Sequence, residues 1–218
     1  MLIKDPFIVN PNTFSLIQEL QSLPFLKDFY LVGGTALALK LGHRNSIDID
    51  LFTQNEFNDN DLIEGLIEHF NLDLIYNRKN TIVCSINNVK ADFTRHNYPF
   101  VNQPITEEGI MYLSLEDICA MKLFAIQNSG KKLKDFIDVY FLLEHFSLNQ
   151  MLDFYQIKYK HSNKLIPLKA INYFDDIDPA IDSSISEEVI SLHKVKERIQ
   201  EATLYGNKNF KNYEIISH

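Results

Sequence analysis

Two adjacent glycines and three aspartates have the types and spacing that could do chemistry in this 218-residue chain. Gly33 and Gly34 let the backbone pass close to a ligand, and a helix that starts there offers free amide groups to a phosphate. Asp48 and Asp50 follow after thirteen residues, and Asp92 lies in the later segment VKADFT. Hard cations such as Mg²⁺ prefer carboxylate oxygens and relieve the repulsion between neighbouring carboxylates. The pattern therefore favours a phosphate site beside a magnesium site.

The segment SIDIDLFT, residues 46–53, alternates polar and apolar residues and is predicted to be a strand with one buried face. Alternate side chains of a strand share a face, so Asp48 and Asp50 would lie about 6.6 Å apart. The other face would carry the core residues Ile47, Ile49 and Leu51. Asp92 lies on a further predicted strand and could bring a third carboxylate. For an isolated D-x-D pattern, a strand whose polar face meets water is at least as frequent as a metal site.

The elements around these residues are predicted from local patterns. Residues 12–23 are predicted to be a helix capped by Asn12 or Thr13, and residues 28–34 a short buried strand that ends in the glycines. The helix that follows would end at Gly42. The remaining predictions for this half are a helix at 59–70, strands at 71–76, 81–86 and 89–94, and a tight hairpin at Asn87 and Asn88.

The character of the chain changes near Leu113, where helical patterns replace strands. The segment SLED, which begins at Ser114, has the form of a capping box ahead of the helical segment ICAMKLFAIQN. Further helices are predicted in KKLKDFIDVYFLLEHF and at 148–160, 165–173 and 185–204. The predicted fold class is therefore α+β, with a mixed sheet and flanking helices in residues 1–112 and a helical domain in residues 113–218.

The formal net charge of −8 argues against a protein that coats nucleic acid through general positive charge. The segment from Lys122 to Lys169 differs, because its eight lysines outnumber its four acids. This basic middle could meet a phosphate backbone. A solvated set of helix faces is the more frequent explanation of such a segment.

Other kinds of site find no support in the sequence. Cys84 and Cys119 lie in apolar surroundings, without a partner at metal or redox spacing, and are predicted to be reduced packing residues. The seven histidines show no zinc-ligand spacing, although His43 could line a nucleotide site beside Arg44. No apolar run approaches the ~20 residues of a membrane helix, and the first residues lack a signal-peptide pattern, so a cytoplasmic protein is expected.

The paired glycines, the D-x-D pair and the later strand aspartate together resemble the signature of DNA polymerase β-like nucleotidyltransferases. The wording GGTALALKLGHRNSIDIDLF is more specific, and resembles the AbiEii/AbiGii abortive-infection toxins of bacteria, the toxic half of type IV toxin–antitoxin pairs. The likeness continues at EDICAMKLFAI and KDFIDVYFLL, and more loosely at PLKAINYFDDIDPAI. It therefore spans most of the chain, and it implies a nucleotidyltransferase-like sheet and an enzyme.

For residues 1–112, the implied catalytic core, the resemblance assigns roles to matching residues. The two glycines and Thr35 would contact the triphosphate of a nucleoside triphosphate. Asp48, Asp50 and Asp92 would bind Mg²⁺, and Asp92 would complete the metal site or assist deprotonation of the acceptor hydroxyl. Arg44 and Ser46 lie just before the aspartates and could hold further phosphate oxygens.

For residues 113–218, the domain implied to complete the nucleotide and acceptor site, Lys122 matches a lysine that family members use near the nucleotide phosphates. Asp135 matches a further functional acid, and Asp138, one helical turn on, is expected to orient its neighbours. Related sequences often carry an arginine shortly before the KDF motif, where this chain has Lys131, Lys132 and Lys134. The ordinary alternatives are an exposed helix lysine and solvated acids paired with nearby lysines.

The resemblance implies transfer of a nucleoside monophosphate from a nucleoside triphosphate to an acceptor hydroxyl, with Mg²⁺ as cofactor and the 3′ end of tRNA as the expected acceptor. A cognate antitoxin is the protein partner that it implies, and no membrane association is expected. Two alternatives remain open: a nucleotidyltransferase that modifies a small molecule or a protein, and a non-catalytic nucleotide-binding interaction module. Three clustered carboxylates argue against the second, because without a metal they would cost stability.

Overall fold

The computed structural model describes residues 1–178, 180–181 and 190–210. The chain divides into two compact units, Met1–Ser114 and Leu115–His218. This division lies two residues beyond the one expected from the change of sequence pattern. Each unit is described below by itself.

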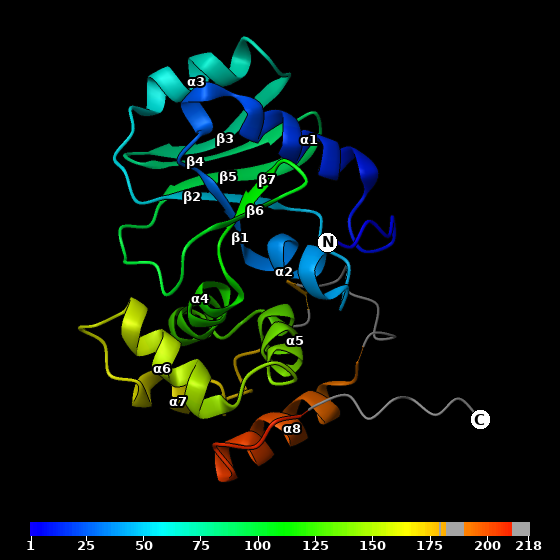
Figure 1. The fold of residues 1–218 in the computed structure, drawn as a ribbon, viewed down its shortest axis with the longest axis vertical. Coiled ribbons are helices and arrows are strands. Elements are labelled where there is room, and N and C mark those ends of the chain that lie inside the picture. The colour runs from blue at the N-terminus through cyan, green and yellow to red at the C-terminus, as the bar shows by residue number, and fades with distance from the viewer. Residues whose placement is uncertain (179, 182–189, 211–218) are drawn as a thin grey trace. The chain divides into compact units, whose positions relative to one another are not determined.

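The first unit is built on a mixed β-sheet (Figure 1). Its strands in chain order are β1 (Tyr30–Val32), β2 (Ile49–Thr53), β3 (Leu72–Arg78), β4 (Thr81–Ile86), β5 (Val89–Arg95), β6 (Ile105–Glu107) and β7 (Ile110–Tyr112). Within the described residues the sheet has seven strands in the order β3-β4-β5-β2-β1-β7-β6. β2 is antiparallel to β1 and parallel to β5. It therefore lies between the strand that leads to the glycines and the strand that carries Asp92.

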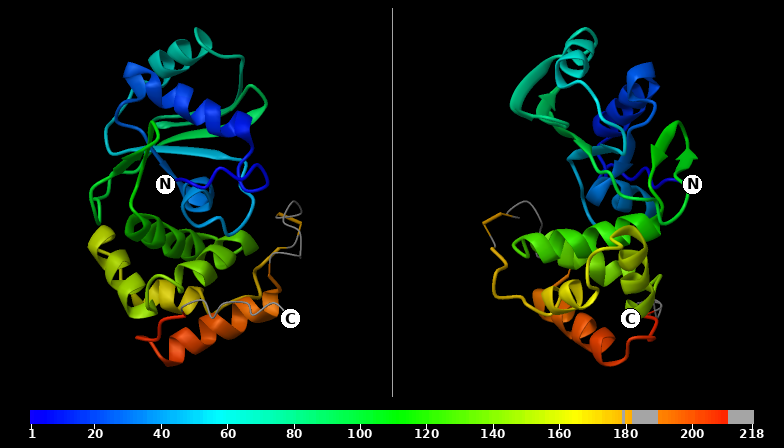
Figure 2. Two further views of the ribbon diagram at one scale, coloured as in Figure 1. Left: turned by 45° about the vertical axis from the view of Figure 1, so that its right-hand side comes forward. Right: turned by 90° about the vertical axis from the view of Figure 1, so that its left-hand side faces the viewer.

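Helices cover both faces of this sheet. They are α1 (Pro11–Ser22), the short 3₁₀ helix η1 (Pro24–Leu26), α2 (Gly33–Leu41) and α3 (Asp59–Ile67). α1 and α3 lie on one side of the sheet and α2 on the other (Figures 1 and 2). The core includes Ile49, Leu51 and Phe93, which are fully buried, and the Phe93 ring lies edge-on to Phe29 at 5.9 Å. Burying rings and branched chains in this way is the main source of the unit's stability.

Several local predictions for this unit are confirmed. The predicted first helix is α1, although its cap is Asn10, whose side chain accepts a hydrogen bond from the Asn12 amide at 2.9 Å. Gly42, with φ +63°, ends α2 as expected. Asn87 and Asn88 take φ values of 51° and 66° in the tight turn between β4 and β5.

One prediction for this unit is wrong, and two of its strands have no counterpart in the sequence predictions. The strand expected over 46–53 begins only at Ile49, and Ile47 is 54% exposed instead of facing the core. The reason lies in the preceding loop, where the Ser46 amide donates to the Ile8 carbonyl at 2.9 Å and the Asp48 carbonyl accepts from a threonine side chain. β6 and β7 were not predicted, since runs of three residues carry too little alternation to detect.

The second unit is helical. It contains α4 (Leu115–Asn128), α5 (Leu133–Leu142), α6 (Leu148–Lys158), α7 (Leu165–Ala170) and α8 (Leu192–Leu204). α4 packs against α5, α6 and α7, and α5 packs against α8. These helices lie within the predicted segments, and the part of the predicted last helix at 185–189 falls outside the described residues. The α+β fold class is therefore confirmed, and no helix in the described part of the chain is long and apolar enough to cross a membrane.

Candidate active site

Both glycines at the start of α2 make room for a predicted functional side chain. Gly33 has φ +71°, and a Cβ atom at this position would lie 2.3 Å from Oδ2 of Asp50. A Cβ atom on Gly34 would lie 2.3 Å from Nη2 of Arg44. Real Cβ atoms do not approach other atoms so closely, so Gly33, with its positive φ as well, requires glycine, whereas at Gly34 the end of the flexible Arg44 side chain would have to move. The paired glycines thus bring the backbone of α2 against a carboxylate and a guanidinium group.

The same turn of α2 is suited to an anion. Gly33, Gly34 and Thr35 are its first three residues, and amide groups in the first turn have no acceptor within their own helix. Their positive end favours negative charge such as a phosphate group. Because Asp50 lies directly beside Gly33, a phosphate bound at this turn would lie close to that carboxylate.

Asp50 and Asp92 are direct neighbours on parallel strands. They are register partners in the pairing of β2 with β5, where backbones run about 4.8 Å apart. Oδ2 of Asp92 accepts a hydrogen bond from Nζ of Lys90 at 2.9 Å. Oδ1 of Asp92 is buried and has no hydrogen-bond partner. A buried carboxylate oxygen without a donor carries a desolvation cost that a bound cation would remove.

Asp48 lies outside the sheet, in the loop that precedes β2. The Thr35 hydroxyl donates a hydrogen bond to the Asp48 carbonyl and lies 2.9 Å from Oγ of Ser46. Thr35 is 1% exposed, so its side chain holds this loop, and its contact with a triphosphate would come from the backbone amide. Among the residues that the structure describes, no three histidine, cysteine or acidic side chains are grouped closely enough to hold a metal ion by themselves.

Thr35→Val is expected to lower the free energy of unfolding by about 1–3 kcal/mol, because it takes the hydroxyl donor away from the partly buried Asp48 carbonyl. Thr35→Ser keeps the hydroxyl and should cost about 1 kcal/mol or less. Urea denaturation of the two variants and the wild type measures both values. Equal losses for Val and Ser would show that the hydroxyl does not hold the loop.

Lys90 is a charged neighbour of this site that was not predicted to belong to it. Partial burial is the largest single effect on the ammonium group and lowers its pKa, but the hydrogen bond to Asp92 and the nearby negative charges together outweigh it, so this pKa is raised. The charges of Asp48 and Asp50 act in the same direction. The signal was present in the sequence, because Lys90 and Asp92 are two residues apart on a strand and share a face.

The helical unit brings together the residues that the resemblance singled out there. Nζ of Lys122, on α4, lies 2.8 Å from Oδ1 of Asp135 and 2.7 Å from Oδ2 of Asp138, both on α5. The side chains of these three residues are 10%, 12% and 0% exposed. The ordinary alternatives, an exposed lysine and solvated acids, are therefore wrong.

A second buried ion pair lies in the same unit. Nζ of Lys158 is 2.7 Å from Oδ1 of Asp117, and the two side chains are 1% and 0% exposed. Two of the eight lysines in the basic middle, Lys122 and Lys158, are thus buried against acids. Asp135 and Asp138 of the same segment are buried as well, so the surface of the segment keeps its excess of lysines, and Lys131 and Lys132 are exposed.

The cysteines are packing residues, as predicted. Both are free thiols and fully buried. Burial, with the nearby charge of Asp92, raises the pKa of Cys84 to about 12. Burial likewise raises the pKa of Cys119. A thiol that stays protonated at neutral pH is a poor nucleophile and a poor metal ligand.

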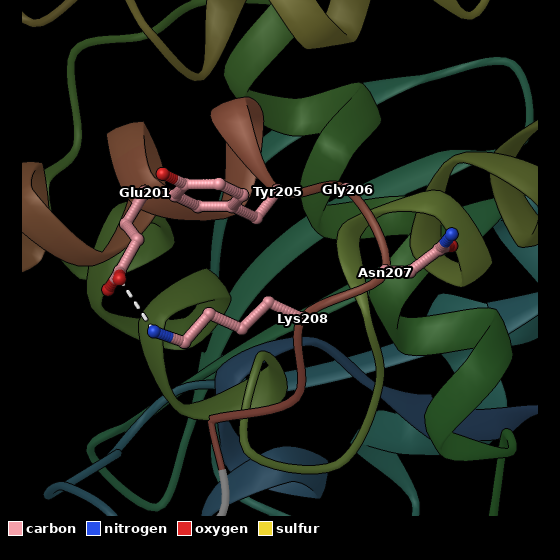
Figure 3. A pocket seen from close by; sticks show the side chains of 5 residues that line it. All are labelled: Glu201, Tyr205, Gly206, Asn207 and Lys208. Atoms are coloured by element: carbon pink, nitrogen blue, oxygen red, sulfur yellow. Dashed lines mark hydrogen bonds and ion pairs between the residues drawn. The ribbon is translucent and has the colours of Figure 1, made fainter.

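An open hollow at the end of α8 holds none of the predicted site residues (Figure 3). Its lining consists of Glu201, Tyr205, Gly206, Asn207 and Lys208. Glu201 and Lys208 form an ion pair at 2.5 Å across it, and both side chains are more than two-fifths exposed. An exposed pair of this kind contributes little to stability and gives no reason to expect a ligand there.

Solved structures resemble this fold at low sequence identity. MenT4, a nucleotidyltransferase toxin from Mycobacterium tuberculosis H37Rv, matches with a TM-score of 0.59 and 13% identity over 87% of this chain and 80% of that one. JHP933 from Helicobacter pylori matches with a TM-score of 0.54 and 17% identity over 90% of this chain and 89% of that one. At these identities the likeness is one of fold.

Sequence comparison gives the family. The family described as "Nucleotidyl transferase AbiEii toxin, Type IV TA system" matches residues 15–191. An uncharacterised protein of Aquifex aeolicus (strain VF5), aq_aa25, is 31% identical over 195 residues, which are 84% of this chain and 94% of that protein. Fold and family together define a nucleotidyltransferase. The chain belongs to the AbiEii nucleotidyltransferase toxins of type IV toxin–antitoxin systems.

Proposed function

We propose that this chain uses Mg²⁺ to transfer a nucleoside monophosphate from a nucleoside triphosphate to an acceptor hydroxyl, and that the acceptor is the 3′ end of tRNA. The observation that carries the proposal is the contact between the start of α2 and Asp50. Glycine is the only residue type that leaves space at position 33, since a Cβ atom there would lie 2.3 Å from the Asp50 carboxylate. Nucleotidyl transfer needs a triphosphate cradle and a metal site within a few ångströms of each other.

The residues present fit a magnesium ion. Mg²⁺ is commonly held by one or two carboxylates together with substrate phosphates, and keeps several waters. Asp50 and Asp92 would supply the two carboxylates, and the partnerless Oδ1 of Asp92 supports this assignment. Asp48, held beside β2 by Thr35, would add a third carboxylate once substrate is bound. When bound, Mg²⁺ would polarise the α-phosphate and neutralise charge on the pyrophosphate leaving group.

The chain's own residues would do the remaining work. The first amide groups of α2 would hold phosphate oxygens, and the Arg44 guanidinium, which lies against Gly34, would hold further ones. Ser46 would contribute a hydroxyl from the same loop. The acceptor oxygen attacks the α-phosphorus, the bond to the pyrophosphate breaks, and the hydroxyl proton passes to Asp92 or to solvent.

Lys122 and Asp135 remain candidate functional residues of the helical unit. Their pairing at 2.8 Å and the 10% exposure of Lys122 support an ordered cluster that keeps some access to solvent. We propose that Lys122 contacts nucleotide phosphates, that Asp135 is a further functional acid and that Asp138 orients both. The family implies an antitoxin as partner, and a cytoplasmic location would give the enzyme its nucleotide and tRNA.

Label transfer tests the proposal. The protein is incubated with each of the four α-labelled nucleoside triphosphates and total tRNA, cell protein or a small-molecule extract, with Mg²⁺ or with excess chelator. We expect label on tRNA, from one preferred nucleotide, that disappears with chelator. Label on protein or on a small molecule would replace tRNA as the acceptor. No label on any acceptor would overturn the proposed activity, and label that persists with chelator would overturn the role of Mg²⁺.

A further inference from the structure

Lys90 is placed where a charge can control access to the proposed metal site. Its Nζ atom lies 2.9 Å from Oδ2 of Asp92, and both residues project from the same face of β5. Asp50, the register partner of Asp92, lies on the adjacent strand of the same sheet. The ammonium group therefore pairs with one oxygen of Asp92, which with Asp48 and Asp50 makes up the acidic cluster of the proposed metal site.

The pair of Lys90 with Asp92 differs from an ordinary surface ion pair. The two side chains are 45% and 23% exposed, so alone the pair would contribute little to stability. Lys90 is, however, attracted by Asp48 and Asp50 as well as by Asp92. Without a positive charge nearby, carboxylates on neighbouring strand positions repel one another. Lys90 relieves that repulsion in a protein that holds no divalent ion.

Lys90 can also leave without repacking the core. Its ammonium group ends a flexible four-carbon stem, and nearly half of its side chain already meets solvent. Oδ2 of Asp92, which it covers, belongs to the same carboxylate as the buried, partnerless Oδ1. A cation that took both oxygens would therefore have to displace only the hydrogen bond from Lys90.

We propose that Lys90 is a built-in counter-ion of the acidic cluster, which pairs with Asp92 in the metal-free protein and turns outward when a divalent cation binds. The proposal rests on the proposed function, because it takes the cation to be that of nucleotidyl transfer. Lys90 is then a positioning residue that sets metal affinity. It competes with the metal for one carboxylate, and any such competitor weakens the apparent affinity.

Lys90→Met removes the charge and keeps the length of the side chain. We expect the variant to bind Mn²⁺, used as a probe without nucleotide, about three- to tenfold more tightly than the wild type, because the competitor is gone. Its unfolding temperature should be lower than that of the wild type without metal and should rise more when metal is added. Lys90→Arg keeps the charge and should stay within about twofold of the wild type.

The experiment is calorimetric titration of the full chain at constant pH and salt, with melting curves for the same samples. Lys79→Met is the matched control, since Lys79 is an exposed lysine at the turn between β3 and β4 of the same sheet. Its affinity for Mn²⁺ should stay within about twofold of the wild type. Unchanged or weaker Mn²⁺ binding by Lys90→Met, with normal binding by the wild type, would overturn the role of Lys90 alone. No Mn²⁺ binding by any of these proteins would overturn the proposed metal site as well.

Discussion

Asp50→Asn is expected to reduce nucleotidyl transfer by at least about 10³-fold while the protein stays folded. A bound metal supplies several kcal/mol of transition-state stabilisation, and each 1.36 kcal/mol is a tenfold change in rate. Asparagine has nearly the same shape as aspartate, so it fits in the place of Asp50 beside Gly33. It has no charge, however, and binds Mg²⁺ far more weakly than a carboxylate does.

The folded state should not suffer from this substitution. Removing one of two adjacent negative charges relieves repulsion with Asp92, and the hydrogen bond from Lys90 to Asp92 at 2.9 Å remains. The melting curve of the variant without metal should therefore still show a cooperative unfolding transition. Asp73→Asn makes the same chemical change at an exposed position of β3 and should leave the rate within about twofold of the wild type. A rate for Asp50→Asn within about tenfold of the wild type would exclude Asp50 as a metal ligand.

The part of the site that could be predicted is the part that depends on residues close together in the sequence. Gly33 and Gly34 are the first residues of a helix, and Asp50 lies on a half-buried strand; alternation and helix spacing are enough to recognise both elements. The hairpin at Asn87 and Asn88 is recognisable because asparagine tolerates positive φ. Short-range chemistry of this kind does not depend on the rest of the fold.

The part that could not be predicted depends on contacts between distant segments. β7 exists because it pairs with β1, where Leu31 and Tyr112 are partners some eighty residues apart in the chain. Ile47 looks like a core residue in the sequence, yet the loop around it bonds to Ile8 and Thr35 in place of a neighbouring strand. Alternation predicts a strand from side-chain pattern alone and carries no information on where backbone hydrogen bonds go.

Buried charge was the feature most underestimated. A lysine on a helix is usually exposed, so the sequence favoured a solvated surface for Lys122 and Lys158. The structure buries both, at 8% and 1% exposure, because each lysine pairs with an acid on a different helix. Such ion pairs can be recognised only once the packing of the helices is known. They place two lysines of the basic segment in the interior of the unit.

Lys158→Met is expected to lower the free energy of unfolding by about 3–5 kcal/mol, since it removes the ammonium group that neutralises the fully buried Asp117 carboxylate. Lys164→Met is the matched control in the same unit. It breaks a pair with Asp153 whose side chains are 50% and 64% exposed, and should cost about 0–1 kcal/mol. Adding Asp117→Asn to Lys158→Met should restore part of the loss, because the group left in the interior is then neutral.

Urea denaturation of the three variants beside the wild type measures these differences. Label transfer at a temperature where each protein is folded separates stability from activity. Because the Lys158 side chain is 1% exposed, it cannot reach a phosphate, and the folded variant should transfer nucleotide at close to the wild-type rate. A loss equal to that of Lys164→Met would mean that other groups already compensate Asp117. A folded but inactive Lys158→Met protein would instead place this ion pair among the residues that organise the reaction.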